Sequence, residues 1–314
     1  MLTQPLSESS NRVPDFYLIR KMSTPTKSRL LSNVGLAMVI PYILFTIIFW
    51  VYPLIWGILI AFKKWNIISP VTEFVGLDNF IKILHDPLFW ISFKNTLIFM
   101  VVFVPLSIIC SLMVALLLNR IKLLRSFFSL GYLMSYVSAG VAYSIVFRLL
   151  FSGDGLINSW LGKVGITIPW FSSPKLAMVS IAFIVVWKFL GYYSLIFLAG
   201  LQSIPSTIYE SAEIAGSSKW MIFRRITVPL LNPSFTIILI FAVILSFNIF
   251  TEPYMITGGG PLDSTQTFMM QIYYQTFTAL HAGYGSSFAI TVAIISFTFV
   301  FIVKKTIEKD MIYS

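Results

Sequence analysis

Six long apolar stretches, separated by short polar segments, dominate the pattern of the chain. They cover about 34–62, 95–118, 127–150, 176–199, 234–256 and 286–303. A helix that crosses the hydrocarbon core of a bilayer needs roughly 20 apolar residues. Open sheet edges are not tolerated in lipid, so strands are not expected in these stretches. The pattern predicts an all-α integral membrane protein with six transmembrane helices, and it predicts kinks at Pro41, Pro53 and Pro105.

The composition supports a membrane protein over a soluble one. The chain has 314 residues, of which 57% are hydrophobic and 11% are charged. Soluble domains usually carry about 25% charged residues. The net charge of +10 is not expected to bind nucleic acid, because the basic residues lie mostly between apolar stretches rather than in a patch with exposed aromatics.

The distribution of lysine and arginine predicts the orientation. If the N-terminus is cytoplasmic, 14 of these residues lie on the cytoplasmic side and 6 on the outer side. Cytoplasmic loops carry the excess of Lys and Arg, so both termini are expected in the cytoplasm. Residues 1–30 are polar and are expected to form a flexible cytoplasmic tail, with the membrane domain over 31–314. The first apolar stretch is too long for a cleaved signal peptide.

A short amphipathic helix on the outer surface is expected within 63–94, where Ile81, Ile83 and Leu84 follow the mixed stretch 74–80.

The polar loop over about 202–229 has a regular pattern of its own. Thr207 and Glu210 have the spacing of a capping box, which predicts a helix that begins there and continues to Ala215. Gly216 is suited to the left-handed conformation that ends a helix. Ser217 or Ser218 can cap a second helix.

Pro229 is expected to stop this second helix near Ile226. In the first helix, Ile208 and Ala212 share one face, and Tyr209 and Glu213 share another. The pattern alone leaves two interpretations open: a docking element for another protein, or an amphipathic connector at the membrane interface.

The same loop carries a motif. Glu210-Ser211-Ala212 is followed by Gly216, Ile226 and Val228-Pro229. This resembles the cytoplasmic loop of binding-protein-dependent ABC importer permeases, whose pattern has Ala and Leu where this chain has Ser211 and Val228. The resemblance implies a type I importer permease fold and a coupling helix over 207–215 that docks to an ATPase subunit. The implied coupling residues are Thr207, Tyr209, Glu210, Ala212, Gly216, Ile226 and Pro229.

Three further segments, 74–80, 198–205 and 257–261, resemble the carbohydrate branch of that family, which includes the maltose-type and glycerol-phosphate-type permeases. The resemblance covers roughly 34–310. It implies import of a mono- or oligosaccharide across a bacterial or archaeal cytoplasmic membrane. It also implies a second permease subunit, two ATP-binding subunits that use ATP and Mg²⁺, and an extracellular or periplasmic solute-binding protein.

The chain is not expected to carry out chemistry itself. Gly162-Lys163-Val164 lacks the spacing and the hydroxyl residue of a phosphate-binding loop. His85 and His281 are isolated, and Cys110 is the single cysteine, so no metal site or cofactor is predicted.

Charged and polar residues inside the apolar stretches are candidates for contact with substrate, since they are costly in lipid. Aromatic rings beside amide and carboxylate groups suit a sugar. The candidates are Lys188, Tyr192, Phe247, Asn248, Glu252 and Tyr143. Lys188 is expected to face the pathway or to pair with an acid from another helix. The alternative for Lys188 is a structural pairing or snorkelling of its stem, and the alternative for the others is helix packing.

Two other functions stay open from the residues alone. An ion-coupled secondary transporter would use Lys188 and Glu252 as coupling groups, but the chain shows no internal repeat. An integral-membrane enzyme would need clustered histidines or carboxylates, which the sequence does not contain.

Overall fold

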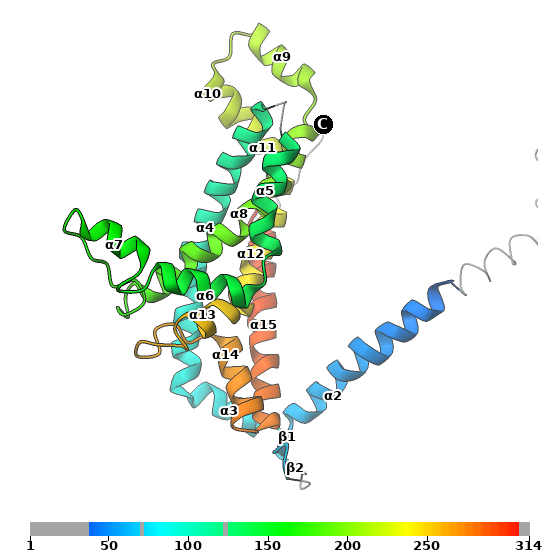
Figure 1. Ribbon diagram of the computed structural model, residues 1–314. Helices are drawn as coiled ribbons and strands as arrows, with labels where there is room; N and C mark the ends of the chain where they lie inside the picture. Colours follow the sequence, from blue (N-terminus) through cyan, green and yellow to red (C-terminus); the bar gives the residue numbers. More distant parts are fainter. Residues whose placement is uncertain (1–37, 70–71, 122–124, 308–314) are drawn as a thin grey trace, which may run out of the picture. The chain divides into compact units, whose positions relative to one another are not determined.

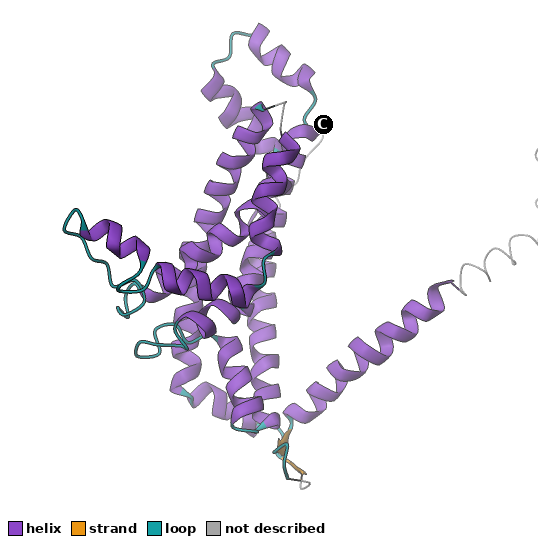
Figure 2. Ribbon diagram, in the orientation of Figure 1, coloured by secondary structure: helices purple, strands orange, loops and turns teal. Residues whose placement is uncertain are grey.

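The computed structural model describes residues 38–69, 72–121 and 125–307. The predicted tail over 1–30 lies outside these residues. Contacts divide the chain into two units, Met1–Trp56 and Gly57–Ser314. Helices dominate the described part (Figure 2).

The first apolar stretch is helical over Met38–Ala61, and its second half is α2 (Tyr52–Ala61). A π-helical turn, η1 (Ile47–Val51), stands directly before Tyr52-Pro53, where the Tyr52 N–H donates to the Ile47 carbonyl. Proline removes a donor and its ring clashes with the carbonyl one turn back. The wider turn lets the helix continue through Pro53.

A two-stranded antiparallel hairpin, which the sequence pattern does not predict, follows α2. It pairs β1 (Lys63–Trp65) with β2 (Thr72–Phe74). The Asn79 side chain ties the hairpin to the next helix by donating to the carbonyls of Ala61 and Lys63 at 2.9 and 3.0 Å. That helix, α3 (Asp78–His85), confirms the predicted short amphipathic helix.

The core of the second unit forms mostly between its long helices (Figure 1). α4 (Pro87–Arg120) packs along α8 (Ala177–Ser203), and α12 (Asn232–Asn248) lies against α4 and α15 (Ala282–Ile307). Phe99, Phe103 and Phe197 are fully buried there. A second cluster lies between α3, α4, α12, α14 (Phe268–Tyr273) and α15, and the π-helical turn η3 (Tyr274–Thr278) continues α14. Packing of this kind holds membrane helices together, because lipid offers no hydrophobic gain.

The sequence predicts one helix over the third apolar stretch, 127–150, but the structure has two helices there. α5 (Arg125–Val137) and α6 (Gly140–Leu150) meet at a 93° bend. Ala139 between them is extended, with φ −57° and ψ 122°. Ser138 and Gly140 flank it, and such small residues are a common cause of sharp kinks. α7 (Leu156–Gly162) follows in the connecting loop.

The predicted fifth span, 234–256, is also wrong in its extent. α12 ends at Asn248, and a separate helix, α13, covers Thr251–Ile256. Pro253 has no N–H to donate to the Ile249 carbonyl, as a continuous helix would require. That carbonyl instead accepts a bond from the Thr267 hydroxyl at 2.9 Å. The helix is therefore broken and its free carbonyl is satisfied from another element.

Among the described residues, four helices are long and apolar enough to cross a membrane: Met38–Ala61, α4, α8 and α15. The number rises to six if each of two bent pairs is one span, Phe127–Val137 with Gly140–Leu150 and Lys219–Leu230 with Asn232–Asn248.

Candidate functional site

The loop that carries the motif folds as two helices around a left-handed glycine. α9 covers Ser206–Ile214, and Gly216 has φ +75°. The Gly216 N–H donates to the backbone carbonyl of Glu213 at 2.9 Å, and the Ser217 N–H donates to that of Ala212 at 3.0 Å. These two bonds are those by which a Schellman motif ends a helix. The predicted left-handed helix end at Gly216 is therefore confirmed.

The predicted capping box is wrong. α9 begins one residue before Thr207, and the residue preceding it, Pro205, makes no side-chain cap. Pro205 occupies the N-cap position with φ −59° and ψ 136°, and its ring has no acceptor for the first N–H groups of the helix. The Ser218 hydroxyl does cap the second helix, α10 (Lys219–Ile222), by accepting from Met221.

Pro229 does not stop the second helix near Ile226. The helix continues through a π-helical turn, η2 (Phe223–Thr227), into α11 (Val228–Leu230), and bends by 61° at Leu231. A π-turn thus stands directly before Val228-Pro229, as another stands before Tyr52-Pro53. Both wide turns accommodate the proline within the helix.

Tyr209 joins the two halves of the loop. Its hydroxyl lies 3.3 Å from the hydroxyl of Thr227 in η2. Sequence reasoning places Tyr209 on a helix face but gives no partner for it. The contact ties α9 to the helix that follows it.

The surface of α9 is open in this chain. None of its residues is buried, and Ile214 is 88% exposed. Ile208 and Trp220 are exposed as well. Glu210 also lies on the exposed surface of α9. An ordered helix that exposes both apolar and acidic side chains has the chemistry of a protein docking surface.

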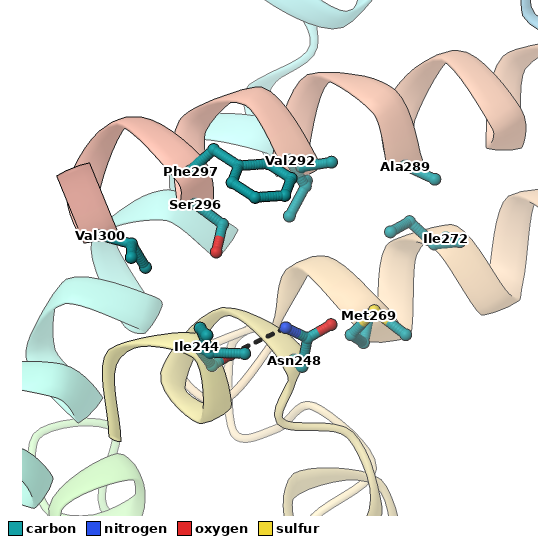
Figure 3. Close-up of a pocket in the computed structure, with 10 residues that line it drawn as sticks. Ile244, Asn248, Met269, Ile272, Ala289, Val292, Ser296, Phe297 and Val300 are labelled. Carbon is teal, nitrogen blue, oxygen red and sulfur yellow. Dashed lines mark hydrogen bonds between the residues drawn. The ribbon is translucent and has the colours of Figure 1, made fainter. Parts of the chain in front are cut away.

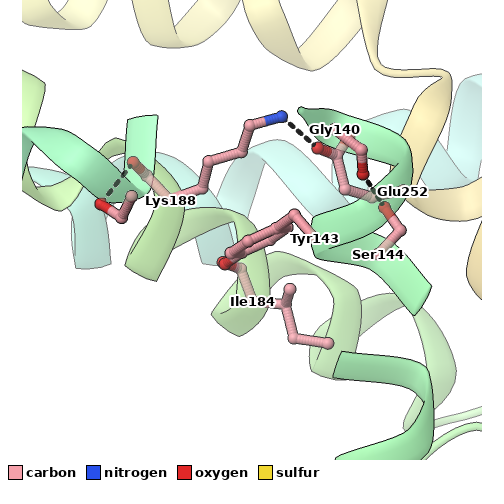
Figure 4. A network of polar contacts seen from close by, with 7 residues as sticks. Gly140, Tyr143, Ser144, Ile184, Lys188 and Glu252 are labelled. Atoms are coloured by element: carbon pink, nitrogen blue, oxygen red, sulfur yellow. Dashed lines mark hydrogen bonds and ion pairs between the residues drawn. The ribbon is translucent and has the colours of Figure 1, made fainter. Parts of the chain in front are cut away.

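A second group of candidates meets inside the membrane domain. Lys188 in the middle of α8 forms an ion pair with Glu252 in α13, with 2.7 Å between Nζ and Oε1. The side chains are 15% and 7% exposed. Of the alternatives open for Lys188, the structure thus shows pairing with an acid from another helix (Figure 4).

The N-terminal turns of α6 enclose this pair. A Cβ at Gly140 would lie 3.3 Å from the Lys188 Nζ and 3.2 Å from the Thr251 Cγ2. The Tyr143 ring lies 5.8 Å from the same Nζ, and its hydroxyl donates to the Ile184 carbonyl (Figure 4). The break before Gly140 therefore places a small residue where the ammonium group needs room.

Tyr192 and Phe247 lie apart from the ion pair. Tyr192 stacks on Tyr136 of α5 with 4.7 Å between ring centroids. Phe247 is 1% exposed and packs against Phe268 and Phe299. In this single chain both contribute to helix packing.

Asn248 lines a separate hollow of about 330 Å³ between α12, α14 and α15. Its amide donates to the Ile244 carbonyl at 2.8 Å. Figure 3 shows it beside Ile244 and Met269, with Ser296 and Phe297 of α15 across the hollow. An exposed amide in an apolar wall can bind one polar group of a ligand.

Comparison with known proteins identifies the chain. Residues 94–312 match the family of binding-protein-dependent transport system inner membrane components. The chain belongs to this family. The permease is 34% identical over 249 residues to the sulfoquinovosyl glycerol transport system permease protein SmoG of Agrobacterium fabrum, covering 78% of this chain and 81% of that one. It is 36% identical over 249 residues to the lactose transport system permease protein LacF of Rhizobium radiobacter, covering 77% and 83%.

A solved structure shares the fold. A chain of a bacterial ABC transporter involved in the import of the acidic polysaccharide alginate superposes with a TM-score of 0.79 at 20% identity, covering 91% of this permease and 99% of that chain. The type I ABC importer permease fold predicted from the resemblance is therefore confirmed. The family also confirms that this chain is a membrane permease subunit and not the ATPase.

Several features of the permease lie beyond what single residues signal. Lys188 and Glu252 are each conspicuous charges in apolar stretches, but 64 residues separate them. Gly140 carries no chemical signal, although it makes room for the pair. The Ser138-Ala139-Gly140 sequence is the one local signal that could have located the break.

Proposed function

We propose that the permease is one transmembrane subunit of an ATP-driven importer for a carbohydrate. The names of several relatives support this substrate class. SmoG and LacF are named for sulfoquinovosyl glycerol and lactose, and a relative from Thermococcus litoralis, 30% identical over 286 residues, is named a trehalose/maltose permease. A mono- or oligosaccharide is the substrate class that these names share.

The coupling role rests on one observation: α9 is an ordered helix with an open surface, fixed to the following helix by a left-handed glycine and by Tyr209. We propose that α9, with Thr207, Tyr209, Glu210 and Ala212, docks into an ATP-binding subunit. Gly216 and the helix through Ile226 and Pro229 then carry the movement to α12.

The proposed assembly follows from the family. A binding-protein-dependent system requires a solute-binding protein outside the membrane. We propose in addition a second permease subunit and two ATP-binding subunits, which use ATP and Mg²⁺. The assembly lies in the cytoplasmic membrane of a bacterium or archaeon.

The proposed topology has six spans with both termini in the cytoplasm, so each bent helix pair counts as one span. Its support lies within the second unit, where the C-terminal ends of α4 and α15 point to the end that carries α9 and α10 (Figure 1). α4 ends at Arg120, and α15 has Lys304 and Lys305 in its last turn. β1, β2 and α3 lie at the opposite end. Arg120, Lys304 and Lys305 thus lie at the end that the positive-inside rule assigns to the cytoplasm.

We propose that the substrate pathway runs past Lys188, Glu252 and Tyr143. Tyr192, Asn248 and Phe247 are further candidates for that pathway, in the assembled importer. The ion pair offers no support for ion-coupled secondary transport, because each of its two charges is already neutralised by the other.

The test is the ATPase activity of the assembled complex in proteoliposomes. A panel of binding-protein-delivered sugars is added, and we expect one class of carbohydrate to stimulate hydrolysis severalfold. Uptake of labelled sugar without any ATP-binding subunit would contradict the proposal.

Replacing Gly216 with proline is expected to lower sugar-stimulated ATPase activity and uptake at least about tenfold while the protein still inserts in the membrane. Proline cannot adopt the φ of +75°, and it removes the N–H that donates to Glu213. A Cβ at this position would meet open space beyond its chain neighbours, so the effect is on the backbone alone.

Gly165→Pro is the matched control. Gly165 has the same φ of +75°, an N–H bonded to Gly162 and open space around it, but lies in the loop after α7. We expect this variant to keep stimulated ATPase activity. Equal losses in the two variants would show a general folding effect and would remove the support for coupling.

A further inference from the structure

A hollow of about 370 Å³ lies where the C-terminal end of α6 meets the turn that follows α13. Neither Lys188 nor Glu252 lines it, and Glu252 lies near the start of α13, whereas the hollow lies at its end. Small-molecule sites range over about 300–1,000 Å³, so this volume suits one sugar ring. Its lining includes Arg148, Phe151, Trp170, Phe171, Thr257 and Gly260.

Arg148 brings a positive charge to this hollow without a matching acid. Its Nη1 donates to the Met255 carbonyl at 3.3 Å. The ion pair between Lys188 and Glu252 is the one that the described residues form, so no described carboxylate neutralises Arg148. The side chain is exposed, and the guanidinium keeps N–H groups free for a ligand. A guanidinium fork matches a carboxylate or sulfonate in two parallel bonds.

Aromatic rings form one wall of the hollow. Phe151 meets Trp170 edge-on with 5.2 Å between centroids, and Phe171 lies 6.4 Å from Phe151. The Trp170 indole N–H donates to the Asn158 side chain at 3.1 Å. Asn158 is buried and also bonds both backbone groups of Ile168. This wall is therefore held in place before any ligand arrives.

The turn that contributes Thr257 and Gly260 to the lining is held by hydrogen bonds. The hydroxyls of Thr257 and Thr265 lie 2.6 Å apart, and Thr265 donates to the Gly260 carbonyl at 2.9 Å. The Asn95 side chain in α4 anchors the same turn by donating to the backbone carbonyls of Asp263 and Gln266 at 2.7 and 3.0 Å. Both parts of the lining are thus held by hydrogen bonds, and Arg148 adds a cation to the same lining.

We propose that this hollow is a binding site for a sugar that carries an acid group, with Arg148 holding the acid and the aromatic wall covering the ring. The sugar part of the ligand rests on the proposed carbohydrate import, while the anion part rests on Arg148 alone. The site lies toward the side of the membrane that is predicted to be outside. A ligand that arrives from outside would therefore reach this site before it enters the membrane.

Isothermal titration calorimetry of the importer complex without its binding protein tests the site. D-glucuronate and D-glucose are the probes, since they share a ring and differ in the carboxylate. We expect glucuronate to bind at least about tenfold more tightly than glucose, as charge-assisted hydrogen bonds require. Arg148→Gln should weaken glucuronate binding by a similar factor, and Arg148→Lys should weaken it less.

Two further variants localise the effect. Lys163→Gln removes an exposed cation from the same loop, outside the hollow, and should leave glucuronate binding unchanged. Phe171→Leu shortens the aromatic wall and should weaken both probes. Equal melting temperatures of Arg148→Gln and the parent confirm that the variant is folded.

The proposal is overturned if glucuronate does not bind, if glucose binds as tightly, or if Arg148→Gln binds glucuronate like the parent. Acetate binding as tightly as glucuronate would overturn the sugar part. Failure of the proposed import is a different result: no sugar-loaded binding protein stimulates ATPase activity, whatever Arg148 binds. Loss of that stimulation in Arg148→Gln with glucuronate binding unchanged would make Arg148 a docking residue and overturn the site.

Discussion

Replacing Glu252 with glutamine is expected to destabilise the permease by about 3–5 kcal/mol, because the Lys188 ammonium would remain buried without its counter-charge. Lys188→Met should cost a similar amount by leaving the carboxylate unpaired. The side chains are mostly buried, so solvent screens little of this effect. The measurement is the midpoint of thermal unfolding of the purified complex, with the yield of assembled complex as a second reading.

The double variant, Lys188→Met with Glu252→Gln, is expected to recover much of the stability, since neither charge remains. Lys94→Met is the matched control, because Lys94 is exposed on α4 and takes part in no described ion pair. Unchanged midpoints in both single variants would show that the pair contributes nothing to the fold.

The double variant also tests the substrate role of the pair. If it assembles and imports sugar at the parental rate, Lys188 and Glu252 are structural and lie off the pathway. If it assembles but loses import, they contact the substrate or its path.

Replacing Gly191 with alanine is expected to prevent normal packing of α5 on α8. The added Cβ would lie 2.1 Å from the Tyr132 carbonyl oxygen and 2.4 Å from its carbon, so the backbone must move. Forced overpacking of a core costs typically about 1–3 kcal/mol, and a backbone clash of this kind lies at the upper end. The same displacement would disturb Tyr136, which stacks on Tyr192.

Gly131→Ala provides the control for this variant. Gly131 lies in α5, and a Cβ added there would have no atom within 4 Å beyond its own helix. Alanine in a helix is favoured over glycine by about 0.5–1 kcal/mol, so this variant should be as stable as the parent or slightly more so. Measured unfolding midpoints that fall equally in the two variants would contradict close packing at Gly191.

The sequence predicts those parts of the fold that depend on local chemistry. The apolar stretches locate the long helices, Gly216 has the left-handed backbone expected of it, and Ser218 caps its helix. Pro229 misleads, because a proline usually ends a helix but here follows a π-turn that accommodates it. Thr207 misleads because Pro205 starts the helix earlier.

Breaks inside apolar stretches are harder to predict, because hydropathy does not register them. The end of α12 depends on Pro253, which cannot bond the Ile249 carbonyl, and on Thr267, which does. The first is visible in the sequence, while the second is a contact between residues 18 positions apart. Lys188 and Glu252 likewise stand out singly, but their pairing depends on the fold.

Of the two helices that flank α9, one is continuous and the other is bent. α8 runs without a break from Ala177 to Ser203, and only Ile204 and Pro205 separate it from α9. At 1.5 Å per residue, α8 is about 40 Å long, and Lys188 lies about 22 Å from the end that leads into α9. The helix on the other side of α9, which begins at Lys219, bends by 61° at Leu231. A movement of α9 would therefore reach Lys188 through one unbroken helix, whereas the same movement would reach α12 through the bend at Leu231.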